Sequence, residues 1–569
     1  QRKNDRNKIG TIINANGMSA DSDAAKAEAF NSVFTSVFKP GPTHDILPPK
    51  IFKGIYHDEL STVSFSPELV ERKLQGLKPH SAPGPDGIHP TILKFCASAL
   101  AVPLSLIYEE SMRSGCLPSD FKKTNVTPIF KSGKKSDPSN YRPINLCSVP
   151  AKVMEGIIKD ELLRHLMENE LILSSQHGFL PRKSCTTNLL AYLNEITSSL
   201  DAGVPFDVVM IDFRRAFDLV PFKQLLQKLE FHGVVGDVLK WVSNWTKNRM
   251  QRVVLNGTCS QWSDVLSSVV QGSVLGPVLF IIFINDIDLA ITDPRTRIFK
   301  YADDSKFGRQ IRSPDDAKTL QTQIDNIWEW SERWGMSIHP TKTLVLHFGH
   351  GNPKHSYSLN GTKITDTTTA KDLGVIIDDL CSPSEHIQVI TKKANGVLSQ
   401  LHRTLLSRNQ EVVSNLFKTF VRLILESAVP AWCPWEKKYI NAIEKVQRRA
   451  TRMIPGLGAM EYEDRLKHCN MITLEQRRQR GDVIEVYKML NGYTSLVNEH
   501  FFTFTSQRHD VITRSSTNKN LVSEKCRLDI RKNFFPNRVV QFWNQLPLDI
   551  REAESVNSFK NAYDDWIKF

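Results

Sequence analysis

Apolar and polar positions follow two different patterns along the chain, and the change falls near residue 380. Over residues 60–377, short runs rich in Val, Ile and Phe alternate with segments of helical periodicity, which predicts a sheet packed with helices. After Cys381 the apolar positions recur at spacings of three, four and seven, as at Ile387, Ile390 and Val397, which predicts amphipathic helices. The fold class expected from this pattern is α+β.

The same pattern divides the chain into four segments. Residues 1–59 are polar apart from one predicted helix and end in a proline-rich stretch, which is typical of a connector. Residues 60–380 form the mixed body, residues 381–461 a first helical part, and residues 462–569 a second, mostly helical region. We find no internal repeat and no low-complexity tract.

Length, charge and cysteine usage narrow the class of protein. With 569 residues, of which 40% are hydrophobic, the chain is long enough for several packed units. A net charge of +12 favours a polyanionic partner such as nucleic acid. The nine cysteines include no C-x-x-C pair, so we expect an intracellular setting and no zinc site. The longest apolar run, Val274 to Ile284, is too short to span a membrane.

Three aspartates stand where predicted strands end. Phe206-Asp-Val-Val-Met-Ile-Asp212 has the apolar run of a buried strand and ends on an acid. Asp303 and Asp304 lie at a predicted turn between two short strands. Adjacent carboxylates repel each other, and a divalent cation relieves that repulsion. Because hard oxygen ligands select Mg²⁺, the three acids predict a site where two Mg²⁺ ions support in-line nucleotidyl transfer.

Six sequence blocks stand in order along the chain, and a further motif closes it. The blocks are Ala82-Pro-Gly-Pro-Asp-Gly87, Asn140-Tyr-Arg-Pro-Ile144, Gln176-His-Gly-Phe179, Val208-Val-Met-Ile-Asp-Phe-Arg-Arg-Ala-Phe-Asp218, Gln271-Gly-Ser-Val-Leu-Gly-Pro277 with Ile284-Asn-Asp286, and Tyr301-Ala-Asp-Asp304; the closing motif is Phe535-Pro-Asn-Arg538 with Phe542-Trp-Asn-Gln-Leu-Pro547. Together they resemble the blocks of non-LTR retrotransposon reverse transcriptases, most of all those of jockey-like elements.

The resemblance implies a right-hand polymerase. Fingers and a palm with a small antiparallel sheet would fill residues 60–380, a helical thumb residues 381–461, and a mostly helical C-terminal region the remainder. The implied activity is that of an RNA-directed DNA polymerase, which extends a DNA primer on an RNA template with deoxynucleoside triphosphates and Mg²⁺.

With the resemblance come roles for individual residues. The metal ligands would be the carboxylates of Asp212, Asp303 and Asp304, with Asp304 the more distant, and the backbone carbonyl of Phe213. Lys342 matches the lysine proposed as general acid for the leaving pyrophosphate.

Contacts to the substrate are implied as well. Phe217, five residues after Asp212, matches the steric gate whose ring excludes a ribonucleotide 2′-hydroxyl. Basic side chains would neutralise the triphosphate, and a glycine would let the backbone approach the nascent base pair. Ala370-Lys-Asp-Leu-Gly-Val375 resembles the hairpin that grips the primer strand. The residues implied to contact substrate, besides Phe213 and Phe217, are Lys131, Arg142, Gln271, Gly272 and Tyr301.

Two stretches depart from the family pattern. Ser268-Val-Val-Gln-Gly272 stands where G-V-P-Q-G is usual, and His339 stands where Asn is common. Neither change removes a metal ligand. Two alternatives to an active polymerase stay open: a catalytically decayed remnant that still binds nucleic acid, and a group II intron maturase-like protein that shares the polymerase blocks.

Partners and location follow from the same resemblance. We expect template RNA and primer DNA as partners, no membrane, and nuclear residence because synthesis in the family is primed at the target DNA. Since position 1 is Gln, the chain is expected to begin inside a longer reading frame, with any endonuclease upstream of it and absent from this chain.

Other clusters have plainer interpretations. Trp328, Trp330 and Trp334, at near-helical spacing, are predicted to pack in a core rather than to stack on bases. The arginines of residues 447–452 and 476–480 are either solvated helix faces or contacts to template phosphates.

Overall fold

The computed structural model describes residues 9–567 apart from 15, 40, 42–57 and 506–519. The chain is α+β, as expected, and divides into two compact units. The first unit contains Gln1–Phe179, Asp212–Thr292 and Asp325–His339, and the second contains Leu180–Ile211, Asp293–Ile324 and Pro340–Phe569. The segment boundaries expected at residues 59, 380 and 461 stay predictions.

The first unit contains a sheet of five short strands. Its strands are β3 (Lys123–Phe130), β4 (Tyr141–Cys147), β6 (Arg249–Leu255), β7 (Thr258–Cys259) and β8 (Ser263–Val265). β3 pairs antiparallel with β4 and parallel with β6, so the two parallel neighbours are joined by a long connection. Helix α1 (Asp23–Thr35) packs on β6, and its Phe30 contacts Tyr141 edge to face at 4.8 Å. Its N-terminus is capped by Ser22, whose hydroxyl accepts a hydrogen bond from the Ala25 amide.

Helices make up the rest of the first unit. They are α2 (Pro67–Gln75), α3 (Pro90–Phe95), α4 (Ala97–Ser114), α5 (Val149–Glu168), α7 (Ala216–Leu219), α8 (Phe222–Phe231), α9 (Gly236–Thr246) and α10 (Gly276–Ile284), with α11 (Pro314–Trp334) reaching into it. The apolar run that contains α10 is buried along its whole length, which agrees with its lack of any polar face.

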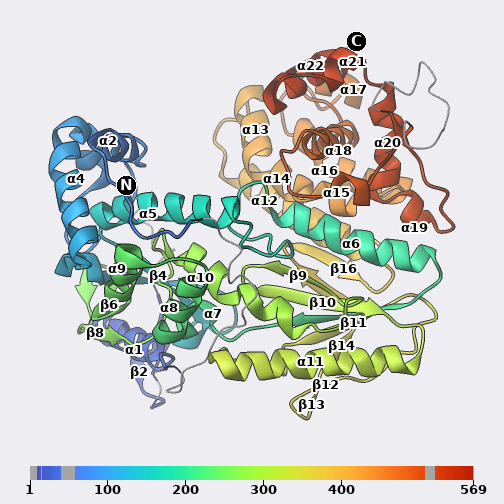
Figure 1. The fold of residues 1–569 in the computed structure, drawn as a ribbon. Helices are drawn as coiled ribbons and strands as arrows, with labels where there is room; N and C mark the ends of the chain where they lie inside the picture. The colour runs from blue at the N-terminus through green and yellow to red at the C-terminus, as the bar shows by residue number, and fades with distance from the viewer. Residues whose placement is uncertain (1–8, 15, 40, 42–57, 506–519, 568–569) are drawn as a thin grey trace. The chain divides into compact units, whose positions relative to one another are not determined.

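The second unit is built on a sheet with strand order β14-β11-β5-β10-β9 (Figure 1). The strands are β5 (Phe206–Ile211), β9 (Arg297–Tyr301), β10 (Asp304–Gln310), β11 (Leu344–Phe348) and β14 (Thr365–Thr367). β5 is central and runs antiparallel to both β10 and β11. The buried run predicted before Asp212 is therefore the middle strand of a sheet.

Helix α6 (Cys185–Asp201) covers one face of this sheet (Figure 1). Its Tyr192 lies against Phe299 of β9 and Phe348 of β11, with ring centroids 5.7 and 6.4 Å apart. A short hairpin follows the sheet in the chain. It consists of β15 (Thr369–Asp372) and β16 (Val375–Asp378), and its apolar side chains join the same core.

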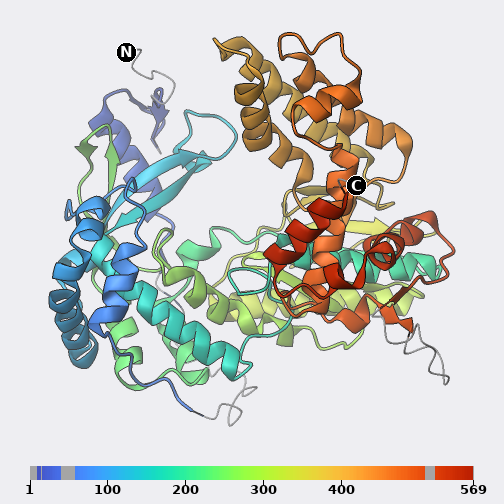
Figure 2. The ribbon, with the colours of Figure 1, turned by 90° about the horizontal axis from the view of Figure 1, so that it is seen from above.

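The chain after Cys381 is mostly helical, as the periodicity predicts. The longer helices are α12 (Ser384–Thr404), α13 (Gln410–Leu416), α16 (Lys437–Arg452), α18 (Leu474–Leu490), α20 (Phe535–Gln545) and α22 (Val556–Ile567); the shorter ones are α14 (Arg422–Glu426), α15 (Val429–Trp432), α17 (Tyr462–His468), α19 (Asp529–Lys532) and α21 (Leu548–Arg551). Figure 2 shows α18 beside α20 and α22.

The motif near the end of the chain holds helices of the second unit together. Arg538 of α20 donates two hydrogen bonds of 2.9 Å to the buried carboxylate of Asp482 on α18. The indole of Trp543, one turn further along α20, is buried. Arg538 thus attaches α20 to α18, while Trp543 packs against Phe559 of α22.

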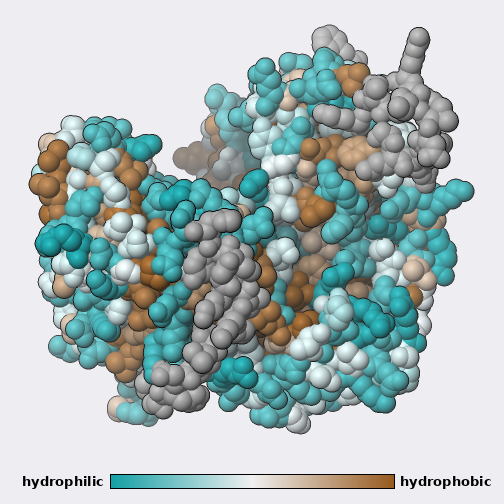
Figure 3. Space-filling view, viewed as in Figure 1, coloured by the Kyte–Doolittle hydropathy of each residue, from teal (hydrophilic) through white to brown (hydrophobic). Residues whose placement is uncertain are grey.

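The first unit has an apolar patch on its surface. Figure 3 shows apolar side chains gathered over α3 and α4 of the first unit, where Ile92, Phe95, Val102, Leu106 and Ile107 are exposed. None of the helices in the described ranges is both long and apolar enough to cross a membrane.

Candidate active site

The strand that leads to Asp212 ends at Ile211, and the residues after it belong to the first unit. There the backbone carbonyl of Asp212 accepts a 2.8 Å hydrogen bond from the His339 amide, and the Arg214 amide donates to the Ser337 carbonyl at 2.8 Å. Phe213 forms a β-bridge with Ile338 between these two bonds. The backbone around Asp212 is thus held by residues 337–339, and its carboxylate is partly exposed.

Asp303 and Asp304 belong to the hairpin of β9 and β10 in the second unit. Tyr301 pairs with Asp304, so the turn consists of Ala302, with a φ of 57°, and Asp303. Both acids were expected in the turn; the structure keeps Asp303 there and makes Asp304 the first residue of β10. Asp303 is partly exposed and Asp304 is exposed.

Strand register relates these segments. Ser305, the residue after Asp304, pairs with Ile211, the residue before Asp212. On the other side of β5, Leu344 pairs with Met210. The exposed Lys342 precedes Leu344 by two residues, just as Met210 precedes Asp212 by two.

The donors in these segments suit a hard cation. They are carboxylates that solvent reaches, without sulfur or imidazole among them, and such oxygen ligands are what Mg²⁺ prefers. Across the residues that the structure describes, no group of three or more His, Cys, Asp or Glu side chains is close enough to hold a metal ion. The assignment of Asp212, Asp303 and Asp304 as ligands stays a prediction.

Tyr301 is tied to the start of α6. Burial raises the pKa of its hydroxyl to about 12, and a hydrogen bond with the thiol of Cys185, the first residue of α6, acts in the same direction. The phenol therefore stays neutral at physiological pH.

Phe217, the predicted steric gate, lies in the first unit where several sequence blocks meet. Its ring stacks on Phe280 with centroids 4.4 Å apart and meets Phe179 edge to face at 6.4 Å. The Phe217 carbonyl accepts a 2.8 Å hydrogen bond from the Val269 amide. The ring is half-buried, so its position is fixed while part of it faces solvent.

The backbone at Gly272 lies close to Asn145, and its predicted approach to the nascent base pair stays a prediction. The amide of Asn145 on β4 donates to the Gln271 carbonyl at 2.8 Å, and its side-chain amide donates to the same oxygen at 3.1 Å. Gly272 has a φ of 121°, and a Cβ there would lie 2.3 Å from the Asn145 carbonyl oxygen. Only glycine fits this position.

Ser268 stands in the same loop at a position where the family pattern has glycine. Its φ is 140°, in the region that glycine favours. Its side chain is buried, and its amide donates to the Val220 carbonyl at 3.1 Å. The loop therefore keeps a glycine conformation although the glycine is gone.

Lys131 and Arg142 lie on the hairpin of β3 and β4. The Lys131 amide donates to the Asn140 carbonyl at 2.9 Å, and Arg142 pairs with Ile129. Both side chains are exposed. An exposed lysine and an exposed arginine on one hairpin suit contact with phosphate oxygens.

Trp330 and Trp334 are buried, as predicted, whereas Trp328 is only partly buried. Lys228 is buried between the first two, 3.6 Å from the Trp334 ring centroid, and its ammonium donates to Asp286 at 2.6 Å. The Trp330 indole donates to the same carboxylate oxygen at 3.2 Å. Asp286 belongs to the Ile284-Asn-Asp286 block, so that acid has a structural role here.

The arginines of residues 476–480 also have partners within the second unit. Arg477 pairs with Glu426, and Arg480 donates to Asp564 at 2.7 Å. Arg478 is buried. These arginines therefore hold helices together, and they do not form the solvated helix face that was one of the two expectations.

A buried polar network on β5 was not anticipated. The Asp207 carboxylate accepts from Tyr357 at 2.6 Å and from Asn352 at 2.7 Å, and lies 2.8 Å from His347. Burial acts to lower the pKa of His347, but the bonds with Asp207 and Asp366 outweigh it and raise that pKa. The signal in the sequence is an acid inside an apolar strand.

Comparison with known proteins identifies the class of protein that these segments resemble. Residues 132–377, which contain the β5 strand, Asp212 and the Asp303–Asp304 turn, match the family model of reverse transcriptase (RNA-dependent DNA polymerase). This part of the chain is a reverse transcriptase domain.

Similar curated proteins refine the class. The probable RNA-directed DNA polymerase from transposon BS of Drosophila melanogaster is 27% identical over 403 residues, which are 68% of this chain and 44% of that protein. The RNA-directed DNA polymerase from mobile element jockey of Drosophila funebris is 25% identical over 400 residues, with the same two shares. The probable polymerase from transposon X-element of Drosophila melanogaster is 22% identical over 459 residues, 78% of this chain and 50% of that protein.

These matches confirm the resemblance seen in the sequence blocks. The chain is similar to jockey-like RNA-directed DNA polymerases of non-LTR retrotransposons. It spans about half the length of the curated relatives it matches.

Proposed function

We propose that this chain is the RNA-directed DNA polymerase of a non-LTR retrotransposon, which extends a DNA primer on an RNA template with deoxynucleoside triphosphates. The observation that carries the proposal is the strand register of the second unit. β10 begins at Asp304, and its next residue pairs with Ile211, which directly precedes Asp212. Such a register supports a shared role for the acids of these two segments.

Asp212, Asp303 and Asp304, with the Phe213 carbonyl, would hold two Mg²⁺ ions. When bound, the ions activate the primer hydroxyl and stabilise the leaving pyrophosphate. The β-bridge at Phe213 and the hydrogen bonds beside it hold the backbone that carries Asp212 and the Phe213 carbonyl. Exposed carboxylates suit this task, because Mg²⁺ keeps several of its waters.

The remaining side chains would bind the nucleotide and the primer. Lys131 and Arg142 neutralise the triphosphate, and the Gln271–Gly272 backbone lies against the nascent base pair. Phe217 excludes the ribonucleotide 2′-hydroxyl. Lys342, exposed before β11, donates a proton to pyrophosphate.

The units correspond to the parts of a right-hand polymerase in this proposal. The β3–β4 sheet with its helices forms fingers, the sheet centred on β5 forms the palm, and α12 to α16 form the thumb. Template RNA and primer DNA are the partners, and the nucleus is the site of action.

The test is primer extension on an annealed RNA template with deoxynucleotides and Mg²⁺. We expect the intact chain to extend the primer, and the variant with both Asp303→Asn and Asp304→Asn to bind the duplex with unchanged affinity but to extend nothing. The matched control carries Glu463→Gln and Asp464→Asn, two adjacent exposed acids on α17, and it should extend normally.

The alternatives predict other results. If the intact chain binds the duplex but extends nothing over a range of divalent ions, the chain is a decayed remnant that only binds nucleic acid. If the double variant extends as well as the intact chain, the metal assignment is wrong.

A further inference from the structure

The hairpin of β15 and β16 has a tight tip beside the sheet of the second unit. Its two turn residues, Leu373 and Gly374, have φ values of 47° and 91°, so the turn follows the right-handed twist of its strands. At this tip Lys371 and Gly374 are exposed, whereas Asp372 is buried, with 7% of its surface exposed. The tip thus presents backbone and one ammonium outward and one carboxylate inward.

The inward carboxylate meets a lysine of the catalytic strand. Lys306 of β10 is 4% exposed, forms an ion pair with Asp372, and lies 4.2 Å from the ring centroid of Tyr192 on α6. Because side chains alternate between the two faces of a strand, Lys306 shares a face with Asp304. One ion pair therefore joins the hairpin tip to the strand that starts at Asp304.

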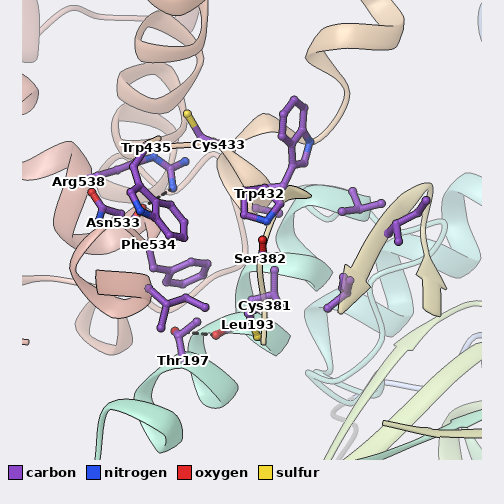
Figure 4. A pocket seen from close by; sticks show the side chains of 16 residues that line it. Leu193, Thr197, Cys381, Ser382, Trp432, Cys433, Trp435, Asn533, Phe534 and Arg538 are labelled. Carbon is purple, nitrogen blue, oxygen red and sulfur yellow. Dashed lines mark hydrogen bonds between the residues drawn. The ribbon is translucent and has the colours of Figure 1, made fainter. Parts of the chain in front are cut away.

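The hairpin buries its apolar side chains, Val375 and Ile377 among them, in the core of the second unit. A cavity lies behind it, bounded by α6, by β16 with the turn that follows it, by the end of α15 and by α19 and α20 (Figure 4). Val375, Ile376 and Ile377 of β16 line this cavity, opposite Phe534 and Trp435. Apolar contacts beside a cavity fix the orientation of a hairpin only weakly, because their energy does not depend on the direction of approach.

The buried ion pair of Lys306 with Asp372 fixes the orientation of the hairpin tip. Compared with apolar side chains of the same size, such a pair adds little stability, but breaking it leaves an uncompensated charge, so it selects one arrangement over others. The aromatic face of Tyr192 further limits where the ammonium can lie.

We propose that Lys306 is a positioning residue of the polymerase: through Asp372 it fixes the tip of the β15–β16 hairpin relative to Asp303 and Asp304, and so sets where the primer end lies. This inference rests on the proposed function. In it, the exposed Lys371 and the Gly374 backbone contact the primer strand, while Lys306 touches neither substrate nor metal.

The same strand offers a matched control. Arg309, at the other end of β10, is 3% exposed and pairs with Asp293 and Asp316. No contact joins Arg309 to the hairpin in the described part of the chain. Replacing Arg309 by Met breaks the two ion pairs of an equally buried cation on the same strand without releasing the hairpin tip.

The first measurement is single-nucleotide incorporation by Lys306→Met, Asp372→Asn and Arg309→Met, expressed per folded molecule. We expect kcat to fall about 100-fold in the first two variants, as for a misplacement near 1 Å, with the Kd for duplex changed by less than about threefold. Arg309→Met should lower the Tm while leaving kcat within about threefold. The double variant Lys306→Met with Asp372→Asn should be no slower than either single variant, and the reversed pair Lys306→Asp with Asp372→Lys should recover part of the rate.

A second measurement needs no activity. Hydrogen exchange of the Thr369–Asp378 amides should accelerate in Lys306→Met and stay unchanged in Arg309→Met. If Lys306→Met keeps its kcat, or loses no more than Arg309→Met does, the inference is overturned. If the intact chain extends nothing, the proposed function has failed, and exchange alone then decides the anchoring: acceleration confined to the hairpin supports it, and unchanged exchange refutes it.

Discussion

Replacing Ser268 by glycine should stabilise the protein. Ser268 holds a φ of 140° in the buried loop that precedes Gln271. Its amide donates to the Val220 carbonyl, and the next amide, of Val269, donates to Phe217. Because both neighbouring bonds hold the backbone, the serine cannot relax to a negative φ without breaking at least one of them.

The size of the gain follows from two opposing terms. A residue with a Cβ in a conformation that glycine favours costs about 1–3 kcal/mol, which Ser268→Gly removes. Glycine loses more chain freedom on folding, which costs roughly 0.5–1 kcal/mol. The net gain is therefore about 1 kcal/mol, equivalent to a Tm rise of roughly 2–4 °C for a unit of this size.

Thermal and urea denaturation followed by tryptophan fluorescence would measure this gain. Ser268→Ala is the control, since it removes the hydroxyl but keeps the Cβ, and it should gain nothing. Equal stabilisation by Ala and Gly would show that the hydroxyl rather than the backbone is at fault. A loss of stability in Ser268→Gly would refute the strain argument outright.

Two further predictions concern the same part of the first unit. Burial raises the pKa of Asp218 to about 6, with Arg215 acting against it, so its stability contribution is complete below about pH 4 and is lost as pH rises through 6. Asp218→Asn should remove this pH dependence of the free energy of unfolding, which amounts to up to about 3 kcal/mol. Denaturation series between pH 4 and 7 would measure it. Phe217→Val should lower discrimination against ribonucleotides by about 10–200-fold in single-nucleotide incorporation; an unchanged ratio would exclude a gate at this ring.

Local structure was predictable where one stretch of sequence contains the whole signal. The run before Asp212 forms β5, and the helical spacing after Cys381 forms helices, because burial and periodicity are local properties. The order of strands β14-β11-β5-β10-β9 was not predictable. It brings β5 beside strands about a hundred residues further along the chain, and a pattern within one strand does not identify its neighbours.

The same distinction applies to the side chains of the site. The need for a glycine at residue 272 was predicted from its motif, but the contact with Asn145 that requires it in this structure was not. Asp207 and Lys306 were missed because their partners stand 140 and 66 residues away from them, at His347 and Asp372. A charged residue inside an apolar strand marks such a position, but the partner comes only from the fold.

The two departures from the family pattern differ in physical kind. His339 joins the site through its backbone amide, which donates to the Asp212 carbonyl, and that bond does not depend on the side chain. Ser268 departs at a position where the site uses a backbone conformation, and there the side chain decides the cost. A substitution weakens such a site when it changes the backbone conformation or the side-chain group on which the site depends. The loss of a glycine at residue 268 is therefore the more costly of the two changes.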